Sequence, residues 1–315
     1  AAVNLLLGKV NPSGKLAETF PRNLADTPSA DNYPAVNGQA LYRESIFIGY
    51  RYYQAAQKKV RWPFGYGLSY TAFEYSDLAV SAERFDPEAG VTVTCKVKNT
   101  GAMAGKEAVQ LYVAPQIPVL FCAPRQLRGF AKVALEPGEE KTVTFRLDKT
   151  AFQYYDSAEK GWRTEGGVYD IEVAASSEDI RLKAPIDVEG DAEPRDMRKV
   201  TPLYYERGGF SNKEFAVIYG KNLPLPKDPG ERPFTLNSTV GDLKGTLASN
   251  MLAKLLAKQM GGMKNDPEMD RMMAAMMEDM PLRGLKAFGM PPLQIEGVLD
   301  LANGHLFRGL KNVLK

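Results

Sequence analysis

The residues of this sequence that could take part in chemistry lie mainly between Tyr42 and Tyr75, where aromatic side chains alternate with glycines and basic residues. Glu44 and Arg51 are the two most interesting charges inside this block. Aromatic rings can stack on the face of a sugar while charged groups hold its hydroxyls, so we consider Glu44 and Arg51 candidates for contact with a sugar substrate. The alternative is that they form local salt bridges that fix a structural junction.

No other catalytic constellation is evident in the sequence. His305 is the only histidine and no G-x-S-x-G elbow is present, so we expect no serine or cysteine triad. A single histidine also argues against a histidine-based metal site, and we expect neither a metal nor an organic cofactor. Glycoside hydrolysis needs two carboxylates at a defined separation. Glu107, Glu139 and Glu140 have the pattern of solvated strand and turn residues, so we assign no catalytic residue.

Composition limits the classes of function. The 315 residues are enough for two or three domains, and 40 basic against 38 acidic residues leave a net charge of +2. No strong field of one sign favours nucleic acid or an anionic membrane, and no apolar run is long enough to span a bilayer. Cys95 and Cys122 do not make a disulfide framework, and free cysteines suit a reducing compartment, so a cytoplasmic location is favoured.

The sequence of residues 1–72 predicts a small number of short elements. Residues 1–7 form a predicted helix that ends at Gly8, and Lys15–Phe20 a predicted strand closed by Pro21. Residues 22–41 are polar and without period, which is typical of a long surface loop. No basic leader precedes the helix, so we expect no signal peptide and a chain that begins inside a domain.

From Phe73 the apolar residues recur with a period of two, which is typical of strands with one buried face. Val91, Val93, Cys95 and Val97 alternate with polar residues, and Cys95 should therefore point into a core. The other predicted strands cover 108–113, 125–133, 142–147, 168–174 and 180–186. Seven or so short strands with turn residues between them predict an antiparallel β-sandwich of the immunoglobulin or fibronectin type III kind over residues 73–190.

Residues 191–315 change to helical patterns. Ser211 and Glu214 form a predicted capping box before a helix that stops at Gly220. Further helices are predicted from Ser238 or Thr239 to Met260, from Glu268 to Asp279, from Leu293 to Ala302 and from His305 to Leu314. The second of these is predicted to begin with Asp266 as its N-cap and Pro267 at the first helical position.

A methionine-rich face lies on one of these predicted helices. Its members are Met269, Met272, Met273, Met276, Met277 and Met280. A methionine face can bind a peptide or pack against the chain's own surface, and contact with a second copy of the chain also stays open.

Three motifs resemble glycoside hydrolase family 3, the β-glucosidase type. They are NPSGKLAETFP (Asn11–Pro21), YRESIFIGYRYY (Tyr42–Tyr53) and PFGYGLSYTAFEYS (Pro63–Ser76). Further segments, VKNTG, QLYVAP, PRQLRGFAKV and PGEEKTVTF, resemble the fibronectin type III-like domain that follows the α/β sandwich in many such enzymes. FAVIYGKNLP, TLNSTVGDL and MPLRGL resemble the C-terminal extension of bacterial members. At Ser45 relatives often have glycine, a departure that concerns a local turn.

The resemblance implies a multidomain chain: the end of an α/β sandwich, a complete β-sandwich and a helical tail. It also implies a retaining hydrolase of terminal β-linked sugars, with an aspartate nucleophile on a barrel and a glutamate acid/base on a loop. Neither segment is expected in these residues, so the chain alone is predicted to be inactive and its oligosaccharide substrate to bind through the barrel. The β-sandwich is expected to support the junction, and residues 22–41 and Gln116–Cys122 to reach an active-site entrance.

A different class of function remains open beside the enzyme. In this alternative the β-sandwich is a non-catalytic module that binds glycans or a protein partner.

Overall fold

A computed structural model describes residues 2–33, 40–191, 193–206, 209–223, 230–260 and 267–314. The chain divides into two compact units, one made of Ala1–Asp31 with Tyr42–Leu223 and one of Asn32–Leu41 with Pro224–Lys315. Within the described ranges, no helix is both long enough and apolar enough to cross a membrane.

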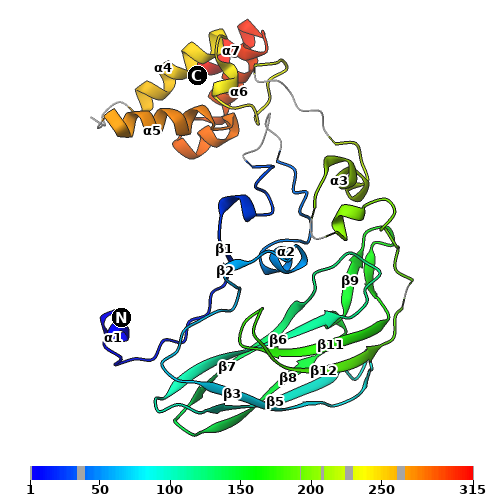
Figure 1. Ribbon diagram of the computed structural model, residues 1–315. Coiled ribbons are helices and arrows are strands. Elements are labelled where there is room, and N and C mark those ends of the chain that lie inside the picture. The colour runs from blue at the N-terminus through cyan, green and yellow to red at the C-terminus, as the bar shows by residue number, and fades with distance from the viewer. Residues whose placement is uncertain are drawn as a thin grey trace. The chain divides into compact units, whose positions relative to one another are not determined.

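A β-sandwich makes up most of the first unit (Figure 1). Its long strands are β3 (Phe73–Val80), β5 (Val91–Asn99), β6 (Gly105–Pro115), β7 (Gln126–Leu135), β8 (Glu140–Leu147), β11 (Gly167–Ala174) and β12 (Ile180–Val188). One sheet has the order β3-β5-β8 and the other β12-β11-β6-β7, and all these ladders are antiparallel. The two-residue strand β4 (Arg84–Phe85) joins the edge of β12 in parallel, which is the one exception to the predicted antiparallel pairing among these strands.

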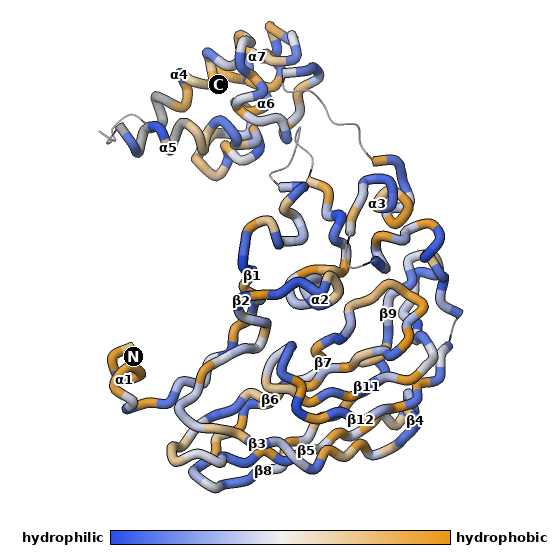
Figure 2. Tube along the Cα trace, viewed as in Figure 1, coloured by the Kyte–Doolittle hydropathy of each residue, from blue (hydrophilic) through white to orange (hydrophobic). Residues whose placement is uncertain are grey.

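The core of the sandwich explains why these residues form strands. Along β5 every second side chain is buried, and the residues that point inward pack with apolar residues of β6, β8, β11 and β12. Cys95 is fully buried there, as the alternation predicts. The alternating hydropathy can be followed along the strands in Figure 2.

A short hairpin that the sequence pattern did not predict extends from the sandwich. Its strands are β9 (Gln153–Asp156) and β10 (Gly161–Thr164), and Tyr155 lies directly opposite Trp162. The Asp156 carboxylate accepts hydrogen bonds from the backbone N–H groups of Ala158 and Glu159, which shapes the turn. Tyr155 and Trp162 therefore lie at the base of a tight turn that is stabilised by its own hydrogen bonds.

Among residues 2–33 and 40–72, which the structure describes, all elements are short. They are α1 (Ala2–Leu6), β1 (Phe20–Pro21), a 3-10 turn (Leu24–Asp26), α2 (Tyr50–Ala55) and β2 (Val60–Trp62). The predicted first helix is present, and Gly8 beyond it has φ +66°. Ser45 has φ +52°, a conformation that glycine adopts more easily, which fits its place in a turn.

The predicted strand at Lys15–Phe20 is wrong except at its last residue. Leu16 exchanges two backbone hydrogen bonds with Gly65 and Tyr66, and no ladder continues from them. The Lys15 side chain instead donates to Glu107 and to the Ala175 carbonyl on the sandwich. A strand exists only where a neighbour pairs with it along its length, which the local sequence does not reveal.

In the described residues that follow the sandwich inside the first unit, a 3-10 turn (Pro202–Tyr204) precedes one α-helix. It is α3 (Asn212–Tyr219), where the Ser211 hydroxyl accepts a hydrogen bond from the Glu214 N–H and Gly220 ends the helix with φ +71°. Both ends are as predicted. The Glu214 carboxylate, however, bonds to the Leu203 N–H instead of completing the capping box.

The second unit is helical, with a core of its own. Its helices are α4 (Leu247–Met260), α5 (Pro267–Glu278), α6 (Pro292–Ala302) and α7 (Leu306–Val313). The prediction that a helix runs from Ser238 or Thr239 is wrong, because Thr239 and Asp242 cap a separate 3-10 turn at Gly241–Leu243 and Gly245 breaks the path with φ +82°. The predicted cap at Asp266 lies outside the described residues.

The methionine face of α5 divides between core and surface. Met277 is buried in the core of the second unit and Met280 packs against it, whereas Met272 and Met276 are exposed. The side chains of Met269 and Met273 are not described. Part of the face therefore packs on the chain itself, and binding of a peptide or of a second copy by the exposed methionines stays a prediction.

Candidate functional site

The aromatic block between Tyr42 and Tyr75 contacts the β-sandwich through Tyr50. Its ring stacks on Phe64 with centroids 5.0 Å apart and meets the edge of Tyr112 on β6 at 5.9 Å. The Tyr50 hydroxyl accepts a hydrogen bond of 2.9 Å from the backbone N–H of Leu127 on β7. Since each buried ring removes a large apolar area from water, these contacts make the block a rigid junction with the sandwich.

A buried glutamine completes this junction. The Gln110 amide nitrogen donates to the carbonyl oxygens of Gly65, at 3.2 Å, and Ala175, at 2.9 Å. Its amide oxygen accepts a 2.7 Å hydrogen bond from the Tyr112 hydroxyl. Every polar atom of the side chain is thus paired, as burial requires.

Glu107 is also part of the junction and is not solvated, which corrects the sequence interpretation. Its side chain is buried, its carboxylate lies 3.0 Å from the Lys15 ammonium, and it accepts a 2.8 Å hydrogen bond from the Tyr75 hydroxyl. Burial, and then the Glu107 charge, raise the pKa of Tyr75 well above its usual range. Glu139 and Glu140, by contrast, lie at the turn into β8 as predicted.

The structure gives Glu44 and Arg51 different surroundings. Both are half-buried, Glu44 in the turn before α2 and Arg51 within α2. The Arg51 guanidinium lies 5.6 Å from the centre of the Tyr50 ring, a cation–π contact. Neither residue forms an ion pair with any residue that the structure describes, so the local salt bridges of the alternative interpretation are not observed.

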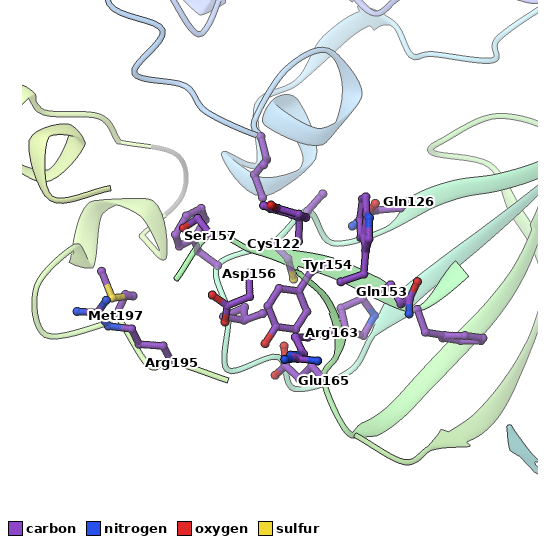
Figure 3. Close-up of a pocket in the computed structure, with 18 of the residues that line it drawn as sticks. Cys122, Gln126, Gln153, Tyr154, Asp156, Ser157, Arg163, Glu165, Arg195 and Met197 are labelled. Atoms are coloured by element: carbon purple, nitrogen blue, oxygen red, sulfur yellow. The ribbon is translucent and has the colours of Figure 1, made fainter. Parts of the chain in front are cut away.

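A cavity of about 1100 Å³ opens beside the sandwich in the first unit (Figure 3). Arg51 lines it and Glu44 does not. Other walls come from the β6–β7 loop at Leu120–Ala123, the β9–β10 hairpin, the end of α3, and Asp191, Glu193, Arg195 and Met197. The predicted functional loop Gln116–Cys122 therefore contributes to this cavity.

Two buried polar atoms of the residues that line this cavity have no protein partner among the described residues. The Arg128 Nε and the Tyr154 hydroxyl are fully buried atoms that lack a hydrogen-bond partner. Glu165 is 7% exposed and accepts a hydrogen bond from the Val119 N–H, but it has no ion pair with a described residue. Figure 3 shows the Tyr154 and Glu165 side chains close together. Such groups cost stability unless something bonds to them.

The pKa values of these residues reflect the same environment. Burial, and secondarily the positive charge of Arg51, lower the pKa of Arg128. Burial also raises the pKa of Tyr154, with the nearby carboxylate of Asp156 adding to the effect. Burial raises the pKa of the Cys122 thiol to about 12, so this cysteine stays protonated and unreactive at neutral pH.

The charges that line the cavity nearly cancel. Its arginines are Arg51, Arg128, Arg163 and Arg195, and its carboxylates are Asp156, Glu159, Glu165, Asp191 and Glu193. Hydrogen-bond donors and acceptors are therefore interspersed without a dominant sign. Across the described ranges, no three His, Cys, Asp or Glu side chains gather as a metal site.

The sequence did not point to Arg128, Tyr154, Trp162 or Glu165, because they come from three different strands and the loop after β10. The one usable signal was the pair of aromatic residues on either side of the turn in YYDSAEKGW.

Two family models match the chain in consecutive order. Residues 1–70 match the glycosyl hydrolase family 3 C-terminal domain, and residues 107–177 match a fibronectin type III-like domain. The second match covers β6 to β11, the centre of the sandwich.

Curated relatives extend these matches. The chain is 38% identical to thermostable beta-glucosidase B of Acetivibrio thermocellus over 305 residues, which is 96% of this chain and 36% of that protein. It is 39% identical to an exo-alpha-(1->6)-L-arabinopyranosidase of Bifidobacterium breve over 232 residues, 73% of this chain and 30% of that protein. The chain thus spans about a third of the length of these relatives.

Solved structures agree in fold. A GH3 beta-glucosidase from Bifidobacterium adolescentis is 41% identical with a TM-score of 0.57, covering 62% of this chain and 29% of that chain. A beta-glucosidase from Kluyveromyces marxianus in complex with glucose is 40% identical with a TM-score of 0.55, covering 59% and 22% respectively.

Proposed function

We propose that this chain, which carries the C-terminal domain of glycosyl hydrolase family 3 and a fibronectin type III-like domain, is the C-terminal part of a β-glucosidase-like retaining glycoside hydrolase. The parent reaction is hydrolysis of a terminal β-linked sugar through a glycosyl-enzyme intermediate. The alignment over 305 residues with a thermostable beta-glucosidase is the observation that carries this proposal.

In this proposal the chain's own role is structural. The nucleophile and the acid/base lie in the part of such enzymes that these residues do not cover, so the isolated chain has no hydrolytic activity. The exposed apolar side chains of Val3, Leu6 and Leu24 support this view, since they offer a surface on which further protein can pack. The junction at Tyr50 and Gln110 then holds that α/β portion against the sandwich.

Glu44 and Arg51 stay the substrate-proximal candidates of the proposal. Both are half-buried and free of ion pairs within the described residues, which leaves their charges available to a ligand. The proposed reaction needs no metal or organic cofactor, and its partner is a β-glucoside or oligosaccharide, not a nucleic acid or a membrane. Contact between two copies through the exposed Met272 and Met276 belongs to the same proposal.

A fusion protein tests the role of the chain. The aligned C-terminal region of the Acetivibrio thermocellus beta-glucosidase B is replaced by this chain, and hydrolysis of 4-nitrophenyl β-glucoside is measured. We expect the fusion to keep activity within about tenfold of the parent, and the isolated chain to show none above background. A folded but inactive fusion beside an active parent would contradict the proposed role, and turnover by the isolated chain would contradict the assignment of the catalytic pair elsewhere.

A further inference from the structure

We propose that the cavity beside the β9–β10 hairpin binds a neutral oligosaccharide, with Tyr155 and Trp162 as the stacking surface and Arg128, Tyr154 and Glu165 as partners of its hydroxyls. This inference goes beyond the proposed function, since none of the matches assigns a ligand to these residues. It rests on four observations: an exposed aromatic pair, unpartnered buried polar atoms, balanced charges and the size of the cavity.

The aromatic pair is an unusual surface feature. Trp162 is 61% exposed and Tyr155 55% exposed, yet both lie on a well-bonded hairpin. Their rings meet edge to face with centroids 5.6 Å apart, so each has a fixed orientation and an open side. Exposed rings held rigidly cost little further entropy on binding, and they present apolar faces to the C–H groups of a pyranose.

The unpartnered polar atoms define what the ligand must offer. The Arg128 Nε and the Tyr154 hydroxyl have no partner among the described residues and can donate, while the Glu165 carboxylate, which already accepts from the Val119 N–H, can accept a further hydrogen bond. A sugar hydroxyl both accepts and donates, so one class of group satisfies all three. The bonds to Arg128 and Tyr154 would each end the cost of a buried atom without a partner.

The charge balance selects a neutral ligand. An anion that entered the cavity to reach Arg128 would also meet Glu165, because both residues line it. A cation near Glu165 would meet Arg163 or Arg128 in the same cavity. The volume of about 1100 Å³ lies at the upper end of ordinary ligand sites, which favours more than one sugar ring.

The two tryptophans of the chain make the site measurable. Labelling with 5-fluorotryptophan gives two 19F resonances, from Trp62 and Trp162, and the Trp62→Phe variant assigns them. The full chain is titrated with cellotriose, a neutral β-linked probe whose choice follows from the proposed function. We expect the Trp162 resonance to shift and saturate at millimolar cellotriose while the Trp62 resonance stays in place.

Variants separate binding from folding. Tyr154→Phe removes a buried hydroxyl that has no partner, so we expect an equally or more stable protein that binds cellotriose about fivefold more weakly. Glu165→Gln should weaken binding at least as much. Glu74→Gln, an exposed carboxylate of β3 outside the cavity, is the matched control and should leave the titration unchanged.

Three results would overturn the inference: no Trp162 shift up to 50 mM cellotriose, unchanged affinity in Tyr154→Phe, or tighter binding of anionic trigalacturonate than of cellotriose. The titration has no hydrolytic readout. Its failure is therefore distinguishable from an inactive fusion, which would test the proposed function alone.

Discussion

Replacing Gly65 by alanine tests the junction between the aromatic block and the sandwich. Gly65 has φ +80°, and a Cβ there would lie 2.2 Å from the Gln110 Oε1 and 2.5 Å from its Nε2. A side-chain end usually moves aside at little cost, but Gln110 is buried and makes three hydrogen bonds. The added methyl group must therefore break those bonds.

The expected loss of stability has two parts. A non-glycine residue at positive φ costs about 1 kcal/mol. Displacing Gln110 removes three hydrogen bonds at about 1 kcal/mol each, so that Gly65→Ala should lower the free energy of unfolding by about 4 kcal/mol. Gly138→Ala is the matched control, because Gly138 has φ +77° and nothing lies within 4 Å of its added Cβ. It should cost only the backbone part, about 1 kcal/mol.

Urea unfolding followed by tryptophan fluorescence measures both variants. Trp62 and Trp162 lie in the first unit, so the signal reports the unit that contains the junction. In the double variant Gly65→Ala/Gln110→Ala the methyl group meets no amide, and the two changes should cost about 2–3 kcal/mol less than their sum. Equal losses in Gly65→Ala and Gly138→Ala, or additive effects in the double variant, would refute this account of the junction.

Four further outcomes are expected. Ser45→Gly should stabilise the first unit by about 0.5–1 kcal/mol in the same urea assay, because it relieves a φ of +52°, and a loss of stability would contradict this. Burial raises the pKa of Cys95 to about 11 and of Cys122 to about 12, so neither thiol should react with a disulfide reagent at pH 8 until urea exposes both. Because burial keeps both thiols protonated in the folded state, their contribution to the free energy of unfolding is complete below pH 8 and is lost as the pH rises towards 12. Cys122→Ala should make this decrease of stability with pH less steep. In the active fusion, Glu44→Gln and Arg51→Gln should each raise KM for the aryl glucoside about three- to tenfold with kcat little changed, and unchanged kinetics in both would remove them as substrate contacts.

The sandwich was predictable because its information is local. The alternation at Val91, Val93 and Cys95 marks one buried face in any sheet, and turn residues separate it from its neighbours. The same reasoning failed at Lys15–Phe20, where no neighbouring strand pairs along the segment. It also failed at Thr239. A capping pattern predicts where a helical turn starts but not how far the helix runs, and Gly245 prevents this turn from continuing as a helix.

The cavity could not be predicted from the sequence for a different reason. Its polar residues matter because they lack hydrogen-bond partners, and only the folded structure shows which partners are missing. Arg128 looks in the sequence like any strand arginine, and only the fold shows that its Nε is buried without an acceptor. Glu107 illustrates the converse, since a carboxylate that looked solvated is buried and fully engaged with Lys15 and Tyr75. Both side chains are buried charges, but the Glu107 carboxylate is paired within the chain and, among the described residues, the Arg128 guanidinium is not. A buried charge that is paired within the chain stabilises the fold. An unpaired buried charge at a cavity can instead contribute binding energy to a ligand that pairs with it.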